Sequence, residues 1–223
     1  MGVIETLTTN DITRVRRHPE RASYDRDLLM DILSNGFVCS VSFQVDGQPF
    51  IIPMTYYNDS EYIYIHGNPA SRIVNTFRSG APLAISVLEL NGIVLAKGLA
   101  SNSMNYRSAI IFGNAVELPT DEDKLSYFTE WIDRMVPGRK EKTILPNEEE
   151  LRGVSAFKVK IEKFSVKVRK GGPVETRKNP EIWSGVIPAS LKFYTPEFAS
   201  GPEAPDYVMR FIESRNGESK KHQ

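Results

Sequence analysis

Cysteine is almost absent from this chain, because Cys39 is the only one among 223 residues. A single thiol forms no intramolecular disulfide and builds no cysteine-based metal cluster. Cys39 lies within the apolar run 37–41, a setting typical of a small buried side chain. We therefore predict a packing role for Cys39 and exclude a fold stapled by disulfides.

An excess of charge is also absent, because 28 Lys and Arg residues balance 28 Asp and Glu residues. Without a net field, the chain has no bulk electrostatic attraction toward nucleic acid or an anionic membrane. No apolar run approaches the roughly 20 residues of a membrane-spanning helix, and the first residues lack the features of a secretory signal. We expect a cytoplasmic protein that binds neither nucleic acid nor a membrane.

The sequence lacks the common catalytic and nucleotide-binding motifs. No Gly-x-Gly-x-x-Gly motif follows a predicted strand, and no Walker loop is present. The histidines His18, His66 and His222 are too scattered for a local metal-binding motif, and Pro19 biases His18 toward an extended conformation. No serine or cysteine nucleophile with its base is recognisable. We therefore predict no metal site and assign no catalytic residue.

Short β-rich segments dominate what the chain does contain. Segments rich in β-branched and aromatic residues predict strands at 37–45, 49–57, 61–66, 82–90, 92–100, 105–117 and 154–169. Asp46-Gly47 and Asn91-Gly92 predict tight hairpin turns between consecutive strands. Because a closed barrel leaves no exposed strand edge, this succession fits an antiparallel barrel.

Helices are fewer. The spacing of apolar residues predicts them at 25–35, 71–78 and 120–136, with a short acidic one at 147–152. We divide the chain into an N-terminal arm (1–24), one domain (25–190) and a C-terminal extension (191–223). The extension is rich in Pro, Gly and Glu, and we expect its polar tail, 214–223, to be disordered.

One stretch has the features of an anion site. Two predicted strands are followed by Gly67-Asn68-Pro69, and a helix is predicted to start at Ser71 and Arg72. Free backbone N–H groups at a helix start favour a phosphate, and a hydroxyl and a guanidinium strengthen that preference. In the alternative interpretation, Ser71 only caps the helix and Arg72 is solvated. The geometry of a helix start leaves both interpretations open.

The order of these residues resembles the flavin-binding split barrel of the pyridoxamine 5′-phosphate oxidase-like superfamily, and within it the nitroimidazole-reductase-like branch. The likeness rests on the hairpin with Pro-Met-Thr at mid-strand, the strand-end His66, Tyr106-Arg107-Ser108-Ala-Ile-Ile-Phe-Gly113, and the segments 166–173 and 182–188. It covers roughly residues 13–190. The resemblance implies a mainly β fold with peripheral helices, an antiparallel split β-barrel that binds flavin mononucleotide (FMN).

The resemblance also implies a site for FMN. The phosphate would lie on a hydroxyl and guanidinium at the helix start, with further basic residues from neighbouring strands, and mid-strand groups would face the flavin ring. The implied cofactor-binding residues are Pro53, Met54, Thr55, His66, Ser71, Arg72, Lys97, Arg107, Ser108, Arg169 and Trp183. The family closes this site with a second chain, so a homodimer is implied, with Arg169 and Trp183 closing the partner's site. Trp183 could instead plug the end of its own barrel.

Two departures from the family pattern limit what the resemblance implies. Ile73 stands where many members carry a second basic residue, and the Arg-Leu-x-Pro signature of the oxidase itself is missing. We therefore do not expect true pyridoxamine phosphate oxidase activity. Two functions stay open: a flavin-dependent oxidoreductase that passes electrons from NAD(P)H to a nitroaromatic or quinone, and a flavin- or haem-binding module without turnover.

Overall fold

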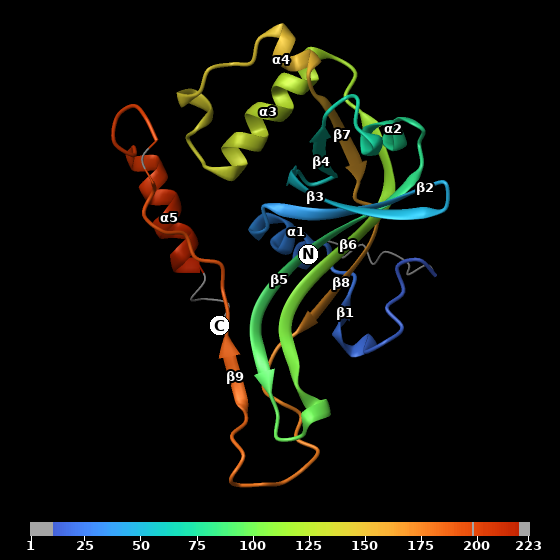
Figure 1. The fold of residues 1–223 in the computed structure, drawn as a ribbon, viewed down its shortest axis with the longest axis vertical. Helices are drawn as coiled ribbons and strands as arrows, with labels where there is room; N and C mark the ends of the chain where they lie inside the picture. The colour runs from blue at the N-terminus through green and yellow to red at the C-terminus, as the bar shows by residue number, and fades with distance from the viewer. Residues whose placement is uncertain (1–10, 198, 219–223) are drawn as a thin grey trace, which may run out of the picture.

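A closed ring of antiparallel strands forms the centre of the computed structural model, which describes residues 11–197 and 199–218 (Figure 1). The ring runs β6-β7-β4-β3-β2-β5 and back to β6, while β1 and β8 extend one side and β9 pairs with β5. The strands are β1 (Ala22–Ser23), β2 (Val38–Val45), β3 (Gln48–Asn58), β4 (Tyr62–Gly67), β5 (Pro82–Leu95), β6 (Ser103–Glu117), β7 (Ser155–Lys160), β8 (Lys163–Arg169) and β9 (Gly185–Pro188).

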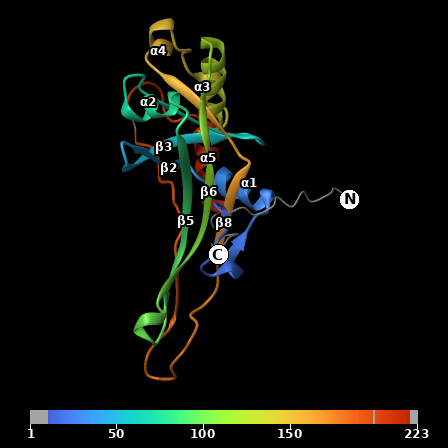
Figure 2. The same ribbon diagram turned by 90° about the vertical axis from the view of Figure 1, so that its right-hand side faces the viewer.

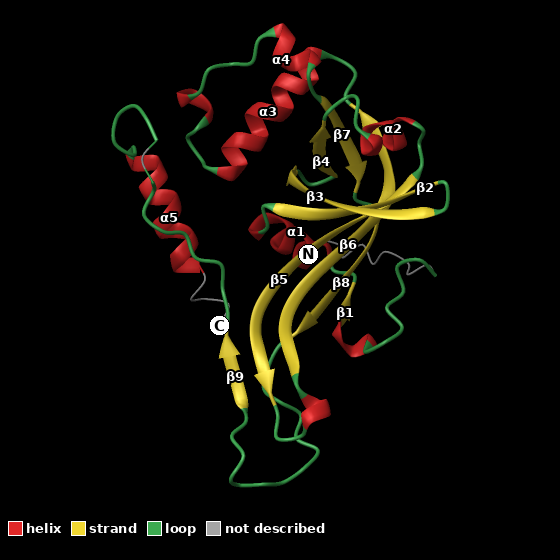
Figure 3. Ribbon diagram, viewed as in Figure 1, coloured by secondary structure: helices red, strands yellow, loops and turns green. Residues whose placement is uncertain are grey.

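Helices lie around the ring, as Figure 3 shows in red. They are α1 (Arg26–Asn35), α2 (Arg72–Arg78), α3 (Asp121–Met135), α4 (Glu148–Arg152) and α5 (Asp206–Glu218), with short 3-10 turns η1 (Pro19–Arg21), η2 (Leu99–Ser101) and η3 (Lys140–Lys142). None of the described helices is long and apolar enough to cross a membrane. The predicted antiparallel barrel with peripheral helices is confirmed.

The core fills the ring because side chains alternate along each strand. Val41 of β2, Ile85 of β5 and Ile111 of β6 are fully buried, and α1 and α2 add apolar faces to the same cluster. Cys39 is buried among them, as predicted, and burial raises the pKa of its thiol to about 12. The same alternation leaves an apolar outer face on β2, β3, β5 and β6, formed by Val38, Ile51, Leu88 and Ile110, which are exposed by 54%, 69%, 67% and 36%.

The predicted hairpin turn at Asn91-Gly92 is wrong. β5 continues through both residues to Leu95, with a register shift between Leu90 and Gly92 where it pairs with β6. Gly92 serves another purpose, because a Cβ atom there would lie 2.9 Å from the carbonyl oxygen of Ile187 in β9. Glycine lets a neighbouring backbone approach closely, and here the neighbour is the C-terminal strand.

Two further predictions need correction. The single strand predicted at 154–169 is two strands, because β7 and β8 pair with different parts of β6 and are separated at Ile161 and Glu162. The tail predicted to be disordered from Ser214 is helical as far as α5 extends, and 219–223 lie outside the described residues. Apolar contacts order α5, since Phe211 packs edge-on against Phe193 and Phe37.

Candidate functional site

The loop between β4 and α2 is a compact turn that fixes the start of α2. The Oγ of Ser71 donates to the carbonyl oxygen of Asn68 at 2.7 Å and accepts from the backbone N–H of Val74 at 3.4 Å. Asn68 also accepts from the N–H of Ala70 through its side chain. Ser71 is therefore the N-cap of α2, which agrees with the capping interpretation and leaves the outer face of the loop for a ligand.

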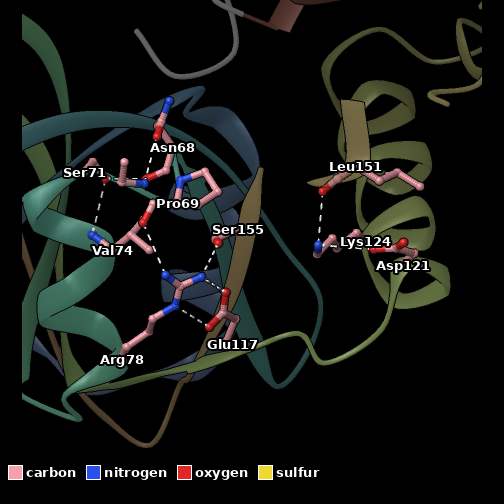
Figure 4. Close-up of polar contacts among 11 residues, drawn as sticks. Asn68, Pro69, Ser71, Val74, Arg78, Glu117, Asp121, Lys124, Leu151 and Ser155 are labelled. Carbon is pink, nitrogen blue, oxygen red and sulfur yellow. Dashed lines mark hydrogen bonds and ion pairs between the residues drawn. The ribbon is translucent and has the colours of Figure 1, made fainter. Parts of the chain in front are cut away.

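Arg78 holds this loop against the sheet, as Figure 4 shows. Its guanidinium donates to both carboxylate oxygens of Glu117 at 2.7 and 2.8 Å, to the Oγ of Ser155 at 2.8 Å and to the carbonyl oxygen of Pro69 at 3.2 Å. The hydrogen bonds from Arg78 lower the pKa of Glu117. One side chain thus ties the end of α2, two strands and the loop before Ser71 together. A separate contact in the same view joins Lys124 of α3 to Asp121 and to the carbonyl oxygen of Leu151.

Arg72 lies on the barrel side of the loop. Its guanidinium stacks over the ring of Phe50, 4.5 Å from the centroid. It lines an open cleft of about 570 Å³ between α2 and the turn from β2 to β3. Arg72 forms no ion pair with any residue that the structure describes. The charge of Arg72 is therefore available to an anion in this cleft.

Gly67, at the end of β4, lies close to both Ser71 and Met54. A Cβ atom built on Gly67 would lie 3.8 Å from the Oγ of Ser71 and 3.9 Å from the methyl group of Met54. Met54 packs against the core, whereas His66, which follows the buried Ile65, packs against α3 on the other face of the sheet. Pro53 and Thr55 flank Met54 on β3, and the side chain of Pro53 is exposed. The structure thus places Met54 near Ser71, whereas His66 lies on the other face of β4, and the role of these residues in binding flavin stays a prediction.

Aromatic side chains surround His66. Its Nδ1 lies 2.6 Å from the hydroxyl of Tyr127, and its ring meets those of Phe128 and Trp131 edge-on, with centroids 5.7 Å away. α3 supplies all three aromatic residues. Burial lowers the pKa of His66, so the imidazole is neutral near pH 7.

We expect acid to destabilise the protein through His66. A pKa lowered by folding means that the unfolded chain binds the proton more readily, so stability is full above 6.5, the ordinary value, and falls as the pH drops through the folded-state pKa. Urea unfolding between about pH 7 and about pH 5 should show this loss. The His66→Gln variant should give a flatter profile, and equal slopes for both proteins would exclude His66 as the titrating group.

The structure does not bring Arg107, Ser108 and Lys97 to the start of α2. Arg107 pairs with Asp31 of α1 and, at 3.4 Å, with Glu89 of β5, so both of its neighbours are carboxylates of the same chain. Ser108 donates to the carbonyl oxygen of Lys167. Lys97 lies in the connection between β5 and β6, and Figures 1 and 2 place this connection at the opposite end of the molecule from α2. Their predicted contact with a phosphate stays a prediction.

Arg169 and Trp183 also lie away from the start of α2. Arg169 is only 8% exposed, and it donates to Asn105 and to the carbonyl oxygen of Gly172, which orders the turn after β8. Trp183 is 64% exposed and its ring covers Gly185, where a Cβ atom would approach it to 2.7 Å. Trp183 is therefore no plug of its own barrel.

Sequence reasoning missed Arg78, which supports the site most directly. Its partners Glu117 and Ser155 lie 39 and 77 residues away along the chain, so no local spacing links them. The only sequence signal was that a basic residue ends the predicted helix 71–78, and such residues are usually solvated. Phe128 and Trp131 fit the apolar spacing of the predicted helix 120–136 and were interpreted as core side chains, so their contact with His66 could not be foreseen.

One family profile matches most of this chain. The profile of a family described as "Pyridoxamine 5'-phosphate oxidase" matches residues 25–168. No curated protein matches the chain.

Solved structures share the fold. The flavocytochrome Anf3 from Azotobacter vinelandii is 24% identical, with a TM-score of 0.83 over 90% of this chain and 96% of its own. A protein from Mycobacterium smegmatis described as binding FAD and haem is 28% identical, with a TM-score of 0.74 over 86% of this chain and 97% of its own. A candidate 5-nitroimidazole antibiotic resistance protein from Bacteroides thetaiotaomicron is 19% identical, with a TM-score of 0.56 over 66% of this chain and 86% of its own.

Proposed function

Because the chain belongs to the pyridoxamine 5′-phosphate oxidase family, we propose that it binds FMN and passes electrons from NAD(P)H to a small acceptor of the nitroaromatic or quinone type. The observation that carries this proposal is the guanidinium of Arg72, which stacks on Phe50, has no ion-pair partner among the described residues, and lines a cleft beside the capped start of α2. Arginine suits a phosphate because its planar fork makes two parallel, charge-assisted hydrogen bonds.

The residues of the cleft and of the adjoining strand ends fit a flavin nucleotide. Arg72 and Ser71 would hold the phosphate, while Pro53, Met54 and Thr55 would offer backbone groups and one hydroxyl to the ring. His66, held neutral by burial and oriented by Tyr127, would contribute a polar edge without a charge. The bound flavin supplies hydride and single-electron transfer, and the chain's part is to bind, orient and shield it.

A second copy of the chain would complete the site. Val38, Ile51, Leu88 and Ile110 are exposed apolar side chains on the outer face of the ring, and exposed apolar side chains on one face are typical of an interface. We therefore propose a homodimer in which Arg169 and Trp183 of one copy approach the flavin held by the other. Sedimentation at micromolar concentration tests this: a monomer that still binds flavin tightly would exclude the arrangement.

Trp183→Phe should then brighten the bound flavin with little change in melting temperature. The side chain is exposed in its own chain, so its loss costs little packing, whereas an indole stacked near the partner's flavin quenches emission. Flavin fluorescence and thermal unfolding of the two proteins measure both effects. A lower melting temperature with unchanged flavin emission would instead assign Trp183 to packing.

The absorption spectrum of the freshly purified protein tests the proposed function first. Flavin bands that bleach on addition of NAD(P)H and return with a nitroaromatic or quinone support the oxidoreductase. Flavin bands that do not bleach with either NADH or NADPH support a flavin carrier without turnover. A colourless protein that does not bind added FMN would contradict the proposal.

A haem-binding function is the second candidate, favoured by two observations. The M. smegmatis protein described as binding FAD and haem is similar over 86% of this chain. Tyr127 engages Nδ1 of His66, and a histidine oriented through one nitrogen is the usual arrangement of a metal ligand. Titration with haemin should give a Soret band that is lost in His66→Ala. An equal Soret band in both proteins would remove His66 as the iron ligand.

A further inference from the structure

Three tyrosines form a stack on the face of the sheet that α3 covers. Tyr57 of β3 pairs with Tyr64 of β4, and their rings are parallel, with centroids 4.5 Å apart. The ring of Tyr127, from α3, lies 5.5 Å from that of Tyr57. Tyr127 is buried, whereas Tyr64 lies beside the exposed Asp59. This tyrosine stack, Tyr127-Tyr57-Tyr64, therefore runs from the interior to the surface.

Each end of the tyrosine stack has its own base. At the inner end, the hydroxyl of Tyr127 lies 2.6 Å from Nδ1 of His66. At the outer end, the hydroxyl of Tyr64 donates to a carboxylate oxygen of Asp59 at 2.7 Å. A buried phenol needs only an acceptor, and a backbone carbonyl would serve. Here both acceptors can also take the proton, and both lie within the reach of direct proton transfer.

The charge states of these groups favour that transfer. Burial lowers the pKa of His66, and the neutral imidazole has one nitrogen without a hydrogen. Burial raises the pKa of Tyr127, so the phenol keeps its proton and donates it to Nδ1. Burial also raises the pKa of Asp59, but hydrogen bonds, one of them from Tyr64, lower it overall and keep the carboxylate ionised. The imidazole is ordinarily the stronger base, with a pKa of about 6.5 against about 3.9 for an Asp carboxyl.

Trp131 also meets the ring of His66, but it lacks a base. Its Nε1 is buried without a hydrogen-bond partner among the residues that the structure describes. An indole that loses an electron becomes a cation, which is stabilised by loss of the N–H proton, and no described group is placed to accept that proton. Tyr127 is therefore the ring beside His66 from which an electron and a proton can leave together.

We propose that Tyr127 is a redox-active tyrosine, oxidised through the tyrosine stack by one-electron oxidants at the surface, such as peroxyl radicals or oxidised metal complexes. The oxidant takes one electron from Tyr64, and Asp59 takes the phenol proton. An electron from Tyr127 then crosses the stacked ring of Tyr57 to reach Tyr64. Tyr64 regains its proton from Asp59, and the proton of Tyr127 moves to Nδ1 of His66.

The products of this sequence balance. The oxidant is reduced by one electron, and the chain holds a neutral tyrosyl radical at Tyr127 beside the imidazolium of His66. The oxidising equivalent then lies on a buried side chain, where solvent and dissolved molecules do not reach it. This activity does not depend on a bound flavin.

Flash photolysis of the purified protein with ruthenium tris-bipyridine and an electron-accepting quencher tests the proposal. The Ru(III) complex removes one electron from the protein surface, and electron paramagnetic resonance after rapid freezing records the radical. We expect a neutral tyrosyl signal that narrows when the protein carries ring-deuterated tyrosine, and that forms more slowly in deuterated water because a proton moves with the electron. No signal, a signal that ring-deuterated tyrosine leaves unaltered, or equal rates in both waters would each overturn the proposal.

Three variants assign the radical and its bases. Tyr127→Phe keeps the ring and removes the phenol, and His66→Gln keeps a hydrogen-bond acceptor that cannot take the proton. Both should lose the long-lived radical. Asp59→Asn keeps an acceptor for the hydroxyl of Tyr64 and should slow formation of the radical severalfold. A radical that persists unchanged in either Tyr127→Phe or His66→Gln would overturn the assignment.

Tyr56→Phe is the matched control. Tyr56 is also a buried tyrosine, but its hydroxyl donates to the carbonyl oxygen of Leu33 instead of a base. The radical should form and persist in Tyr56→Phe as in the wild type, and its loss there would contradict the role of the bases. Thermal unfolding of every variant separates a lost radical from a lost fold. The flavin absorption bands, recorded in every protein, report separately on the proposed function.

Discussion

Replacing Arg78 with Met should lower the melting temperature by about 4–8 °C and weaken FMN binding roughly tenfold. The first effect follows from losing charge-assisted hydrogen bonds to Glu117, worth about 2 kcal/mol after allowance for partial exposure of the pair, at ~2–4 °C per kcal/mol for a chain of this size. The second follows from freeing Pro69, because the loop before Ser71 must then be ordered when the ligand binds. Thermal unfolding and flavin titration measure the two effects.

The control for Arg78 is Arg152→Met, which removes an exposed pair with Glu148 on α4 and should change stability by less than about 0.5 kcal/mol. Acid gives a second check. The pKa of Glu117 is lowered from 4.5, so the pair stabilises the fold above that pH and loses its effect as the pH falls through the folded-state pKa. The wild type and Arg78→Met should therefore converge in stability as the pH falls below 4.5 and through the folded-state pKa of Glu117. A less stable variant with normal FMN affinity would show that Arg78 does not position the loop.

Replacing Arg72 with Ala should weaken FMN binding by about 1.5–3 kcal/mol, or roughly 10- to 150-fold, and leave riboflavin binding nearly unchanged. Arg72 is the guanidinium in the cleft at α2, and it forms no ion pair with any described residue that would compete with a phosphate. Riboflavin has no phosphate, so the difference between the two ligands isolates this contact. Fluorescence titration of both flavins measures it.

Arg107→Ala is the informative comparison for Arg72. Loss of the Arg107 guanidinium leaves Asp31 and Glu89 without their shared cation, so the free energy of unfolding should fall. The preference for FMN over riboflavin should stay unchanged. Equal losses of FMN and riboflavin affinity in Arg72→Ala would contradict the assignment of the phosphate to Arg72. If Arg107→Ala lost the preference for FMN over riboflavin, the phosphate-binding site would have to be assigned to β6 instead.

The sequence predicted those parts of the fold that depend on local periodicity. β2 alternates as expected, and Ile73, Val74 and Phe77 form the buried face of α2. The prediction of a hairpin at Asn91-Gly92 was wrong because glycine is typical both of a tight turn and of a place where another backbone comes close. Only the position of β9 beside Gly92 distinguishes the two cases. α5 was missed since its contacts come from residues distant in the chain, Phe37 above all.

In the candidate site, too, the sequence predicted the positions that depend on local spacing and not those that depend on distant residues. Ser71 and Arg72 are neighbours in the chain, so their shared position at the start of α2 followed from spacing. Met54 lies near Ser71, as the predicted hairpin and helix start imply, whereas His66 faces α3 on the other side of β4. Arg107 could not be placed, because a long cationic side chain takes the carboxylates within its reach, and Asp31 is 76 residues away. Residue types indicate which chemistry is possible, whereas ion pairs decide which charges remain for a ligand.

The partners of the long strand β5 differ in their distance from it along the chain, and this difference predicts which strand pairs with β5 first during folding and which detaches first. Its partner β6 follows it directly, so their pairing closes a short loop, whereas Gly185 pairs with Leu95, 90 residues earlier in the chain. β9 adds only four residues at the outer edge of β5 and has no strand beyond it among the described residues. We therefore expect β9 to dock after the ring has formed and to detach from it at a lower free energy than global unfolding. For the same reason we expect the amide protons of β9 to exchange with solvent while those of β2 and β6 are still protected.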